Sequence, residues 1–168
     1  MRIFLVILAM LSLFLIPTAA SAAPYCGITW GSQQKEVMDT GTGEVDNVRT
    51  GQHDCYDRVV VDIDGPPAGY RAEYVSEVTA DGSGHVVNTP GGARIQFIVR
   101  HPNYGSTPVG ASVANVSGYR TLRSVVYAGS FEGQTTYGVG TRARLPFRVF
   151  TIPGGHGRIV LDVAHRWS

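Results

Sequence analysis

The sequence predicts an all-β protein, an antiparallel β-sandwich of about seven to nine strands. Apolar and polar residues alternate with a period of two in several short runs. In residues 57–64 this alternation places Val59, Val61 and Ile63 on one face. Glycine and proline, 21 and 9 residues in all, separate the runs, as is typical of short strands joined by turns. Two packed sheets are the usual way to bury so many strands that are apolar on one face.

The same alternation predicts further strands in order along the chain. They cover residues 69–78, 85–88, 93–100, 121–128, 145–152 and 158–165. The side chains expected to face the core from three of these strands are Tyr70, Ala72, Tyr74, Ile95, Phe97, Val99, Ile159, Leu161 and Val163. Residues 81–84 contain an Asp-Gly pair, which tolerates positive φ, and are predicted as a turn. Residues 31–41, 101–117 and 129–140 are expected to be loops or turn regions.

The beginning of the chain, residues 1–22, has the pattern of a cleaved signal peptide. A basic residue precedes an apolar run at 3–16, and Pro17 and small residues lead to cleavage after Ala22, with Ala23 as the alternative. A membrane anchor is the other interpretation, but the run of about 14 residues is shorter than the roughly 20 that span a bilayer. We expect a secreted protein, extracellular or associated with the cell envelope, with no transmembrane segment in the mature chain.

The remaining residues are expected to fold as one unit. Residues 23–44 are predicted to be an N-terminal extension, and residues 45–168 the β-domain. The chain has two cysteines, Cys26 and Cys55, and an even number in an oxidising compartment favours a disulfide. That bond would join the extension to the domain. The alternative, a nucleophilic Cys55, is disfavoured because a secreted thiol with a second thiol available usually oxidises.

Charge balance and residue spacing argue against several classes of ligand. The 14 basic and 13 acidic residues nearly cancel, and no basic block is present to bind nucleic acid. Asp62 and Asp64 share a strand face, but no loop supplies the roughly six to eight oxygens that calcium needs. The histidines lack the spacing of a zinc site, at His53, His85, His101, His156 and His165. We expect no metal and no cofactor.

No catalytic residue is predicted. The G-x-S-x-G nucleophile elbow is missing, and the G-x-G-x-x-A pattern at 138–143 precedes a predicted strand, where a phosphate site needs a helix. Charged residues near strand ends are predicted instead to form a polar cluster, of Asp57, Arg58, Glu132, Asp162 and His165. Its favoured role is to pin the strand ends, and ligand binding is the alternative. A small secreted hydrolase could also use three dispersed members, Asp57, Glu132 and His165.

Four aromatic residues are candidates for ligand contacts because they lie in or beside predicted loops. They are Tyr104, Tyr119, Phe131 and Tyr137. Flat rings stack on sugar faces and contribute strongly to protein interfaces. The alternative is that some of these rings close the ends of the sandwich.

Glycines, prolines and strand-end charges form an ordered series of short motifs along most of the chain. The motifs are residues 46–49 with Gly51 and His53, then 57–62, 67–71, 74–75, 81–84, 130–133, 138–140, 146–149 and 158–165. Taken together they resemble the AMIN-like domain of secreted and lipoprotein-type proteins from high-GC Gram-positive bacteria, over about residues 46–167. One departure is Cys55, which stands where the family often has glycine. With Cys26 it suggests a disulfide specific to a subgroup.

The resemblance implies a β-sandwich related to the AMIN domain. AMIN domains occur in periplasmic amidases and secretion-pore proteins, which they direct to the cell wall or division site. The resemblance supplies a fold and no active site, and a shared fold does not fix function. We therefore expect a non-catalytic binding module whose partner is a cell-wall polymer, such as peptidoglycan or a surface polysaccharide, or an envelope protein. A further hypothesis is signalling through a sheet edge that pairs with a partner strand.

Overall fold

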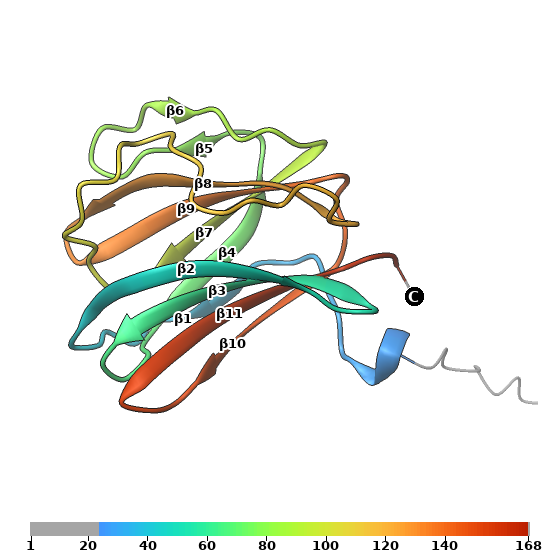
Figure 1. Ribbon diagram of the computed structural model, residues 1–168, viewed down its shortest axis with the longest axis horizontal. Helices are drawn as coiled ribbons and strands as arrows, with labels where there is room; N and C mark the ends of the chain where they lie inside the picture. The colour runs from blue at the N-terminus through green and yellow to red at the C-terminus, as the bar shows by residue number, and fades with distance from the viewer. Residues whose placement is uncertain (1–23, 168) are drawn as a thin grey trace, which may run out of the picture.

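The computed structural model describes residues 24–167, and the expected signal peptide at 1–22 lies outside them. The all-β class is confirmed (Figure 1), with eleven strands in the described range where seven to nine were expected. A short 3-10 turn, η1 (Tyr25–Gly27), comes first. The strands are β1 (Lys35–Val37), β2 (Glu44–Gln52), β3 (Tyr56–Asp64), β4 (Tyr70–Val75), β5 (Val78–Thr79), β6 (Val86–Val87), β7 (Ala93–Val99), β8 (Leu122–Phe131), β9 (Gln134–Thr141), β10 (Phe147–Ile152) and β11 (His156–Ala164).

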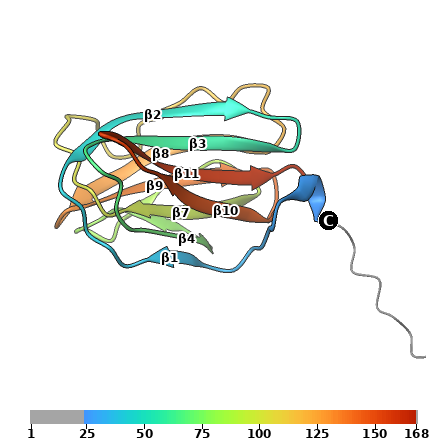
Figure 2. The ribbon, with the colours of Figure 1, turned by 90° about the horizontal axis from the view of Figure 1, so that it is seen from below.

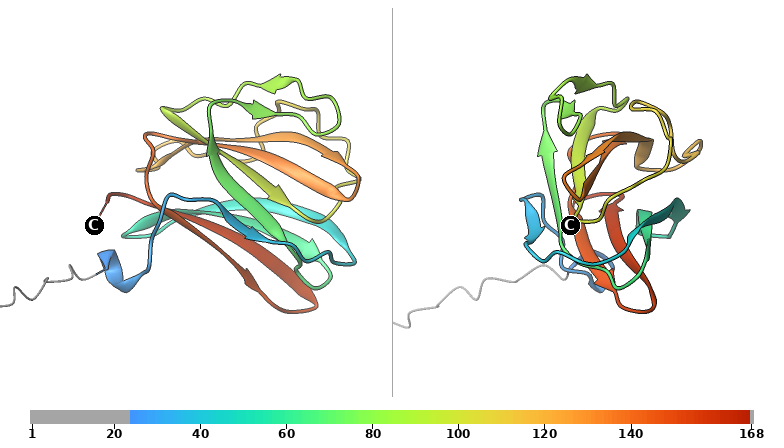
Figure 3. Two further views of the ribbon diagram at one scale, coloured as in Figure 1. Left: turned by 180° about the vertical axis from the view of Figure 1, so that it is seen from behind. Right: turned by 90° about the vertical axis from the view of Figure 1, so that its left-hand side faces the viewer.

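The strands form two packed antiparallel sheets and one small hairpin (Figure 3). The five-stranded sheet has the order β1-β4-β7-β9-β8, and the four-stranded sheet has the order β10-β11-β3-β2. Strands β5 and β6 pair only with each other. All neighbours in the two sheets run antiparallel. This arrangement confirms the predicted sandwich.

The core lies between the inner faces of the two sheets. The predicted alternation is confirmed, because Val59, Val61 and Ile63 of β3 are fully buried there. The nine core side chains expected from the other strands also join this cluster, with Tyr74 at its partly buried margin. Tyr74 further donates a hydrogen bond of 2.7 Å from its hydroxyl to the carbonyl of Leu145. Apolar burial between the sheets is therefore the main stabilising contribution to the fold.

The two outer faces of the sandwich are covered differently. The β5–β6 hairpin lies on the outside of the five-stranded sheet, where Val78 and Val87 bury Val126 and Ala128 in a second apolar cluster. The corresponding face of the four-stranded sheet bears no such hairpin among the described residues, and Figure 2 shows β2, β3, β11 and β10 side by side on that face. This open sheet face is where the functional candidates are found.

The prediction of a turn region at 129–140 is wrong, because β8 and β9 form a long hairpin there. Its tight turn lies at Glu132 and Gly133, both with positive φ. Gly140 is inside β9, and a Cβ on it would lie 1.8 Å from the carbonyl oxygen of Pro90. The glycines of 138–143 thus permit close packing against the segment after β6, in a strand and not in a turn.

Strands β1 and β2 were also not expected. Residues 31–41 were predicted to be a loop, but Lys35–Val37 pairs with β4 as the edge strand of the larger sheet. In β2 the pairing register with β3 shifts between Val45 and Asn47. This β-bulge lets Val45 and Val48 both contact the core, which breaks the period-two pattern that identifies a strand.

His101 is a fully buried histidine whose surroundings hold it neutral. Its Nε2 accepts the backbone N–H of Ala68 at 3.0 Å, so the proton resides on Nδ1, which faces the carbonyl of Gly43 at 3.3 Å. Burial lowers the pKa of His101 below its ordinary value of about 6.5.

This lowered pKa predicts a loss of stability in mild acid. Below about pH 6.5 the unfolded chain takes up a proton at this residue that the folded chain resists, so the free energy of unfolding falls as pH decreases toward the folded pKa. His101→Gln keeps a donor and an acceptor without a titrating ring, and its urea midpoint should fall less between pH 7 and pH 5. Equal losses in the two proteins would contradict the assignment.

Candidate functional site

The open face of the four-stranded sheet carries a cluster of arginine and aromatic side chains. Strand register places Arg148 of β10 beside Asp162 of β11, and Asp162 beside Arg58 of β3. All three side chains point outward, because their neighbours Phe147, Val163 and the apolar residues of β3 face the core. The β10–β11 hairpin and β3, which is distant from it in sequence, thus supply one row of charges.

Asp162 is fully buried beneath the two arginines. The Nε and Nη2 atoms of Arg58 donate to the two carboxylate oxygens of Asp162 at 2.6 and 2.9 Å. Arg148 donates from Nε to Oδ2 of the same carboxylate at 2.9 Å. The hydrogen bond to Asp162 raises the pKa of Arg58. One carboxylate shared by two guanidinium groups leaves this row with one net positive charge.

Aromatic rings surround the two guanidinium groups. The central carbon of Arg148 lies 4.9 Å from the ring centre of Phe150 and 5.5 Å from those of Trp30 and Tyr56. Arg58 lies 5.2 Å from the ring of Tyr56 and 5.5 Å from that of Phe150. Such cation–π contacts hold the guanidinium planes in place. We call these five residues, Trp30, Tyr56, Arg58, Arg148 and Phe150, the arginine–aromatic patch.

The disulfide predicted between Cys26 and Cys55 is present and supports this patch. It ties the turn before β3 to the 3-10 turn η1, and the Nε1 of Trp30 donates to the carbonyl of Tyr25 in that turn at 2.8 Å. Trp30 therefore lies 5.9 Å from Tyr56, measured between ring centres. The N-terminal segment contributes directly to the candidate surface.

The patch retains hydrogen-bonding capacity toward solvent. A guanidinium group has five N–H donors, and the contacts of Arg58 and Arg148 with Asp162 and Tyr56 do not use their Nη1 groups. Their side chains are 21 % and 31 % exposed. Two fixed, partly exposed cations framed by rings can bind a carboxylate, a phosphate or a hydroxyl group that arrives from solution.

Asp57 and His165 meet at the same strand ends, on the inner side. Fully buried Asp57 accepts the backbone N–H groups of Thr121 and Leu122 at 2.6 and 3.0 Å. Its other oxygen lies 3.0 Å from Nε2 of His165, whose Nδ1 lies 3.1 Å from the carbonyl of Asp54. These contacts join β3, β8 and the end of β11.

The five residues predicted as one polar cluster are therefore divided among three places. Arg58 and Asp162 lie on the outer face, and Asp57 and His165 lie beneath the strand ends. Glu132 is in the β8–β9 turn, at the far end of β8 from Leu122. The positions of these groups depend on the strand register, which cannot be read from their spacing in the sequence. Asp57, Glu132 and His165 therefore do not meet in one site, as a hydrolase that used all three would require.

The four loop aromatics do not share a surface either. Tyr104 and Phe131 are 79 % and 52 % exposed. Tyr119 packs on the core and donates its hydroxyl to Thr50 at 3.1 Å. Tyr137 belongs to β9 and is 1 % exposed, so its assignment to a loop is corrected. A groove of about 1010 Å³ lies between residues 110–119 and β8, and Tyr119 is the only one of these four rings that lines it.

Sequence reasoning missed Trp30, Tyr56, Arg148 and Phe150 as site residues. A signal was present in residues 147–150, where an arginine and a phenylalanine alternate with two residues that face the core. Arginine and aromatic residues are enriched in protein interfaces, so their occurrence together on one strand face was a signal available in the sequence.

The structure defines the class of the chain as an antiparallel β-sandwich with an arginine–aromatic patch on the outer face of its four-stranded sheet. Among residues 24–167 the structure has no helix with the length and apolar character required to cross a bilayer. A family model described as the AMIN-like domain matches residues 43–165, and the chain belongs to this family. The membership associates it with the cell envelope. No curated protein matches the chain.

Proposed function

We propose that the protein is a secreted, non-catalytic module that binds an anionic cell-wall polymer, peptidoglycan or a charged surface polysaccharide, through the arginine–aromatic patch. The observation that carries the proposal is the shared carboxylate of Asp162, which fixes Arg58 and Arg148 side by side on an uncovered sheet face. Family membership supplies the connection to the envelope.

The chemistry of the patch favours an acidic polymer with sugar rings. Each arginine has donors directed away from Asp162, and charge-assisted hydrogen bonds to carboxylate or phosphate are stronger than neutral ones. Trp30, Tyr56 and Phe150 place apolar ring surface beside those donors, which suits the faces of sugar rings. The patch lies on the outer face of a sheet, where an extended polymer can contact it.

The proposal is tested by sedimentation of the processed protein with purified, insoluble cell wall. The test variant is Arg148→Gln, because Asp162 keeps its two hydrogen bonds with Arg58 and the fold is retained. We expect its affinity to fall about tenfold, which corresponds to the loss of one charged hydrogen bond. Binding of the wild-type protein should weaken with added salt.

The matched control is Arg94→Gln, which removes the same charge from the outer face of the other sheet. It should sediment like the wild-type protein. Failure of the wild-type protein to sediment more than an unrelated secreted β-protein would contradict the function. Equal retention of the wild-type protein and Arg148→Gln would show that the patch is not the binding surface. Binding that is lost when proteins are stripped from the wall preparation, but is kept when the polymer is removed, would favour an envelope protein as the partner.

A further inference from the structure

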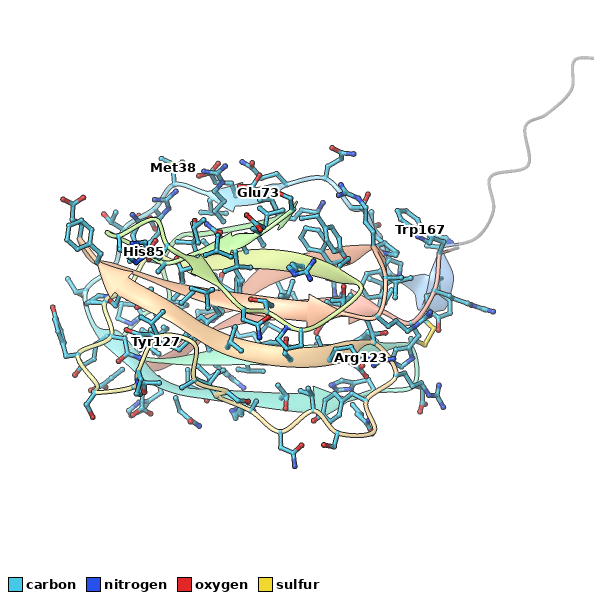
Figure 4. The ribbon with its side chains drawn as sticks, turned by 90° about the horizontal axis from the view of Figure 1, so that it is seen from above. Met38, Glu73, His85, Arg123, Tyr127 and Trp167 are labelled. Carbon is cyan, nitrogen blue, oxygen red and sulfur yellow. A yellow bond between two sulfur atoms is a disulfide. The ribbon has the colours of Figure 1, made fainter. Side chains whose placement is uncertain are left out.

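A second, separate feature is a pocket of about 300 Å³ beside the bulge of β2. One wall is β2 and the other is the loop of residues 100–121 between β7 and β8. Figure 4 shows this loop passing along β8 near Tyr127, and the backbones of Gly110 and Tyr127 are hydrogen bonded at 2.8 Å. On the other side, the N–H of Val45 donates to the carbonyl of Pro102 at 2.8 Å. The pocket is therefore preformed, with a volume at the small end of ligand sites.

The floor of the pocket contains a buried polar group without a partner. Tyr137 lines the pocket and is 1 % exposed, and its hydroxyl makes no hydrogen bond among the described residues. Burial raises the pKa of Tyr137, so the hydroxyl keeps its proton. The side chain of Asn103 lies near this hydroxyl and acts to lower its pKa, but the two groups do not meet the geometry of a hydrogen bond. A buried polar group left unsatisfied destabilises the free protein and requires an explanation.

The bulge directs polar side chains to the rim of the same pocket. Asp46 is the extra residue of the bulge, and bulges often re-aim side chains next to functional sites. Asp46 and Asn47 line the pocket from β2, and Asn103, Thr107 and Ser112 line it from the loop. The lining thus combines hydroxyl, carboxamide and carboxylate groups, which donate to and accept from neutral hydroxyls.

We infer that this pocket binds one neutral sugar unit, with the Tyr137 hydroxyl and the polar rim as its hydrogen-bonding partners. No lysine, arginine or histidine lines the pocket, and Asp46 would repel an anion. A single carboxylate is too few for a divalent cation. A small polyhydroxylated ligand satisfies the hydroxyl at the floor and the groups at the rim together. The site is distinct from the arginine–aromatic patch and does not depend on the function proposed for it.

The inference is tested by NMR titration of the ¹⁵N-labelled processed protein with glucose, galactose and N-acetylglucosamine. Glucuronate serves as the anionic counterpart, and glycerol serves as a control for weak polyol effects. We expect saturable shifts of the Asn47, Asn103 and Ser112 amides with at least one neutral sugar, and weaker binding of glucuronate. Tyr137→Phe should lower the affinity about fivefold, the usual effect of one hydrogen bond.

The thermal stability of the same variant separates a ligand site from an ordinary core residue. Removal of an unsatisfied hydroxyl should raise the Tm of the free protein by about 3 °C, while Tyr104→Phe, at an exposed tyrosine, should change neither affinity nor Tm. The inference is overturned if no neutral sugar produces saturable shifts, or if glucuronate binds as tightly as the neutral sugars. It also fails if Tyr137→Phe binds as well as the wild-type protein or has a lower Tm.

Discussion

Replacement of Asp57 by alanine is expected to lower the free energy of unfolding by about 3–5 kcal/mol. The carboxyl group of Asp57 is fully buried, accepts the backbone N–H groups of Thr121 and Leu122 at the start of β8, and lies 3.0 Å from Nε2 of His165. Alanine would leave those donors buried without an acceptor and would leave a space the size of the carboxylate. Urea unfolding followed by circular dichroism measures the change.

Two further variants isolate the reason for this loss. Asp57→Asn keeps the shape and one acceptor oxygen, and we expect it to cost about 2 kcal/mol. Asp64→Ala removes an exposed carboxylate from the other end of β3, and it should cost less than about 0.5 kcal/mol. If Asp57→Ala unfolded within about 1 kcal/mol of the wild-type protein, the contacts of Asp57 with Thr121, Leu122 and His165 would not be what holds the strand ends together.

The strands that could be predicted are those whose two faces differ regularly. Residues 57–64 alternate with Val60 as the one apolar residue on the polar face, and the pattern predicted all of β3 except Tyr56. The bulge at Asp46 concealed β2, because an added residue reverses the phase of the alternation. Gly138 and Gly140 concealed β9, since packing against Thr89 and Pro90 excludes the side chains that would have shown a pattern.

The candidate surface was harder to predict because it depends on strand order. Arg58 and Asp162 were recognised as strand-end charges, but their pairing requires β11 to lie beside β3 with this register. Arg148 joins them only because β10 is the next strand in the same sheet. Trp30 is brought to the patch by a segment that carries almost no strand pattern. Which strands lie side by side in an antiparallel sandwich is determined by packing over the whole domain. The spacing of residues within one segment does not predict it.

Reduction of the Cys26–Cys55 disulfide is expected to lower the free energy of unfolding by about 3–4 kcal/mol, or the Tm by about 10 °C. The two cysteines are 29 residues apart, and in the chain-entropy model a closed loop of this length restricts the unfolded chain by that amount. The closed loop contains β1 and β2, which pair with β4 and β3 in different sheets. When either sheet unfolds, part of the segment closed by the disulfide therefore unfolds with it.

The double variant Cys26→Ser/Cys55→Ser tests whether the stabilisation is global. It should unfold at the Tm of the reduced wild-type protein, and a reducing agent should not change its Tm. Its affinity for cell wall should also fall, because Trp30 is held against Tyr56 and Arg148 by the turn that contains Cys26. An unchanged Tm after reduction would mean that the N-terminal segment detaches before the sandwich unfolds. The disulfide would then position the patch without stabilising the domain.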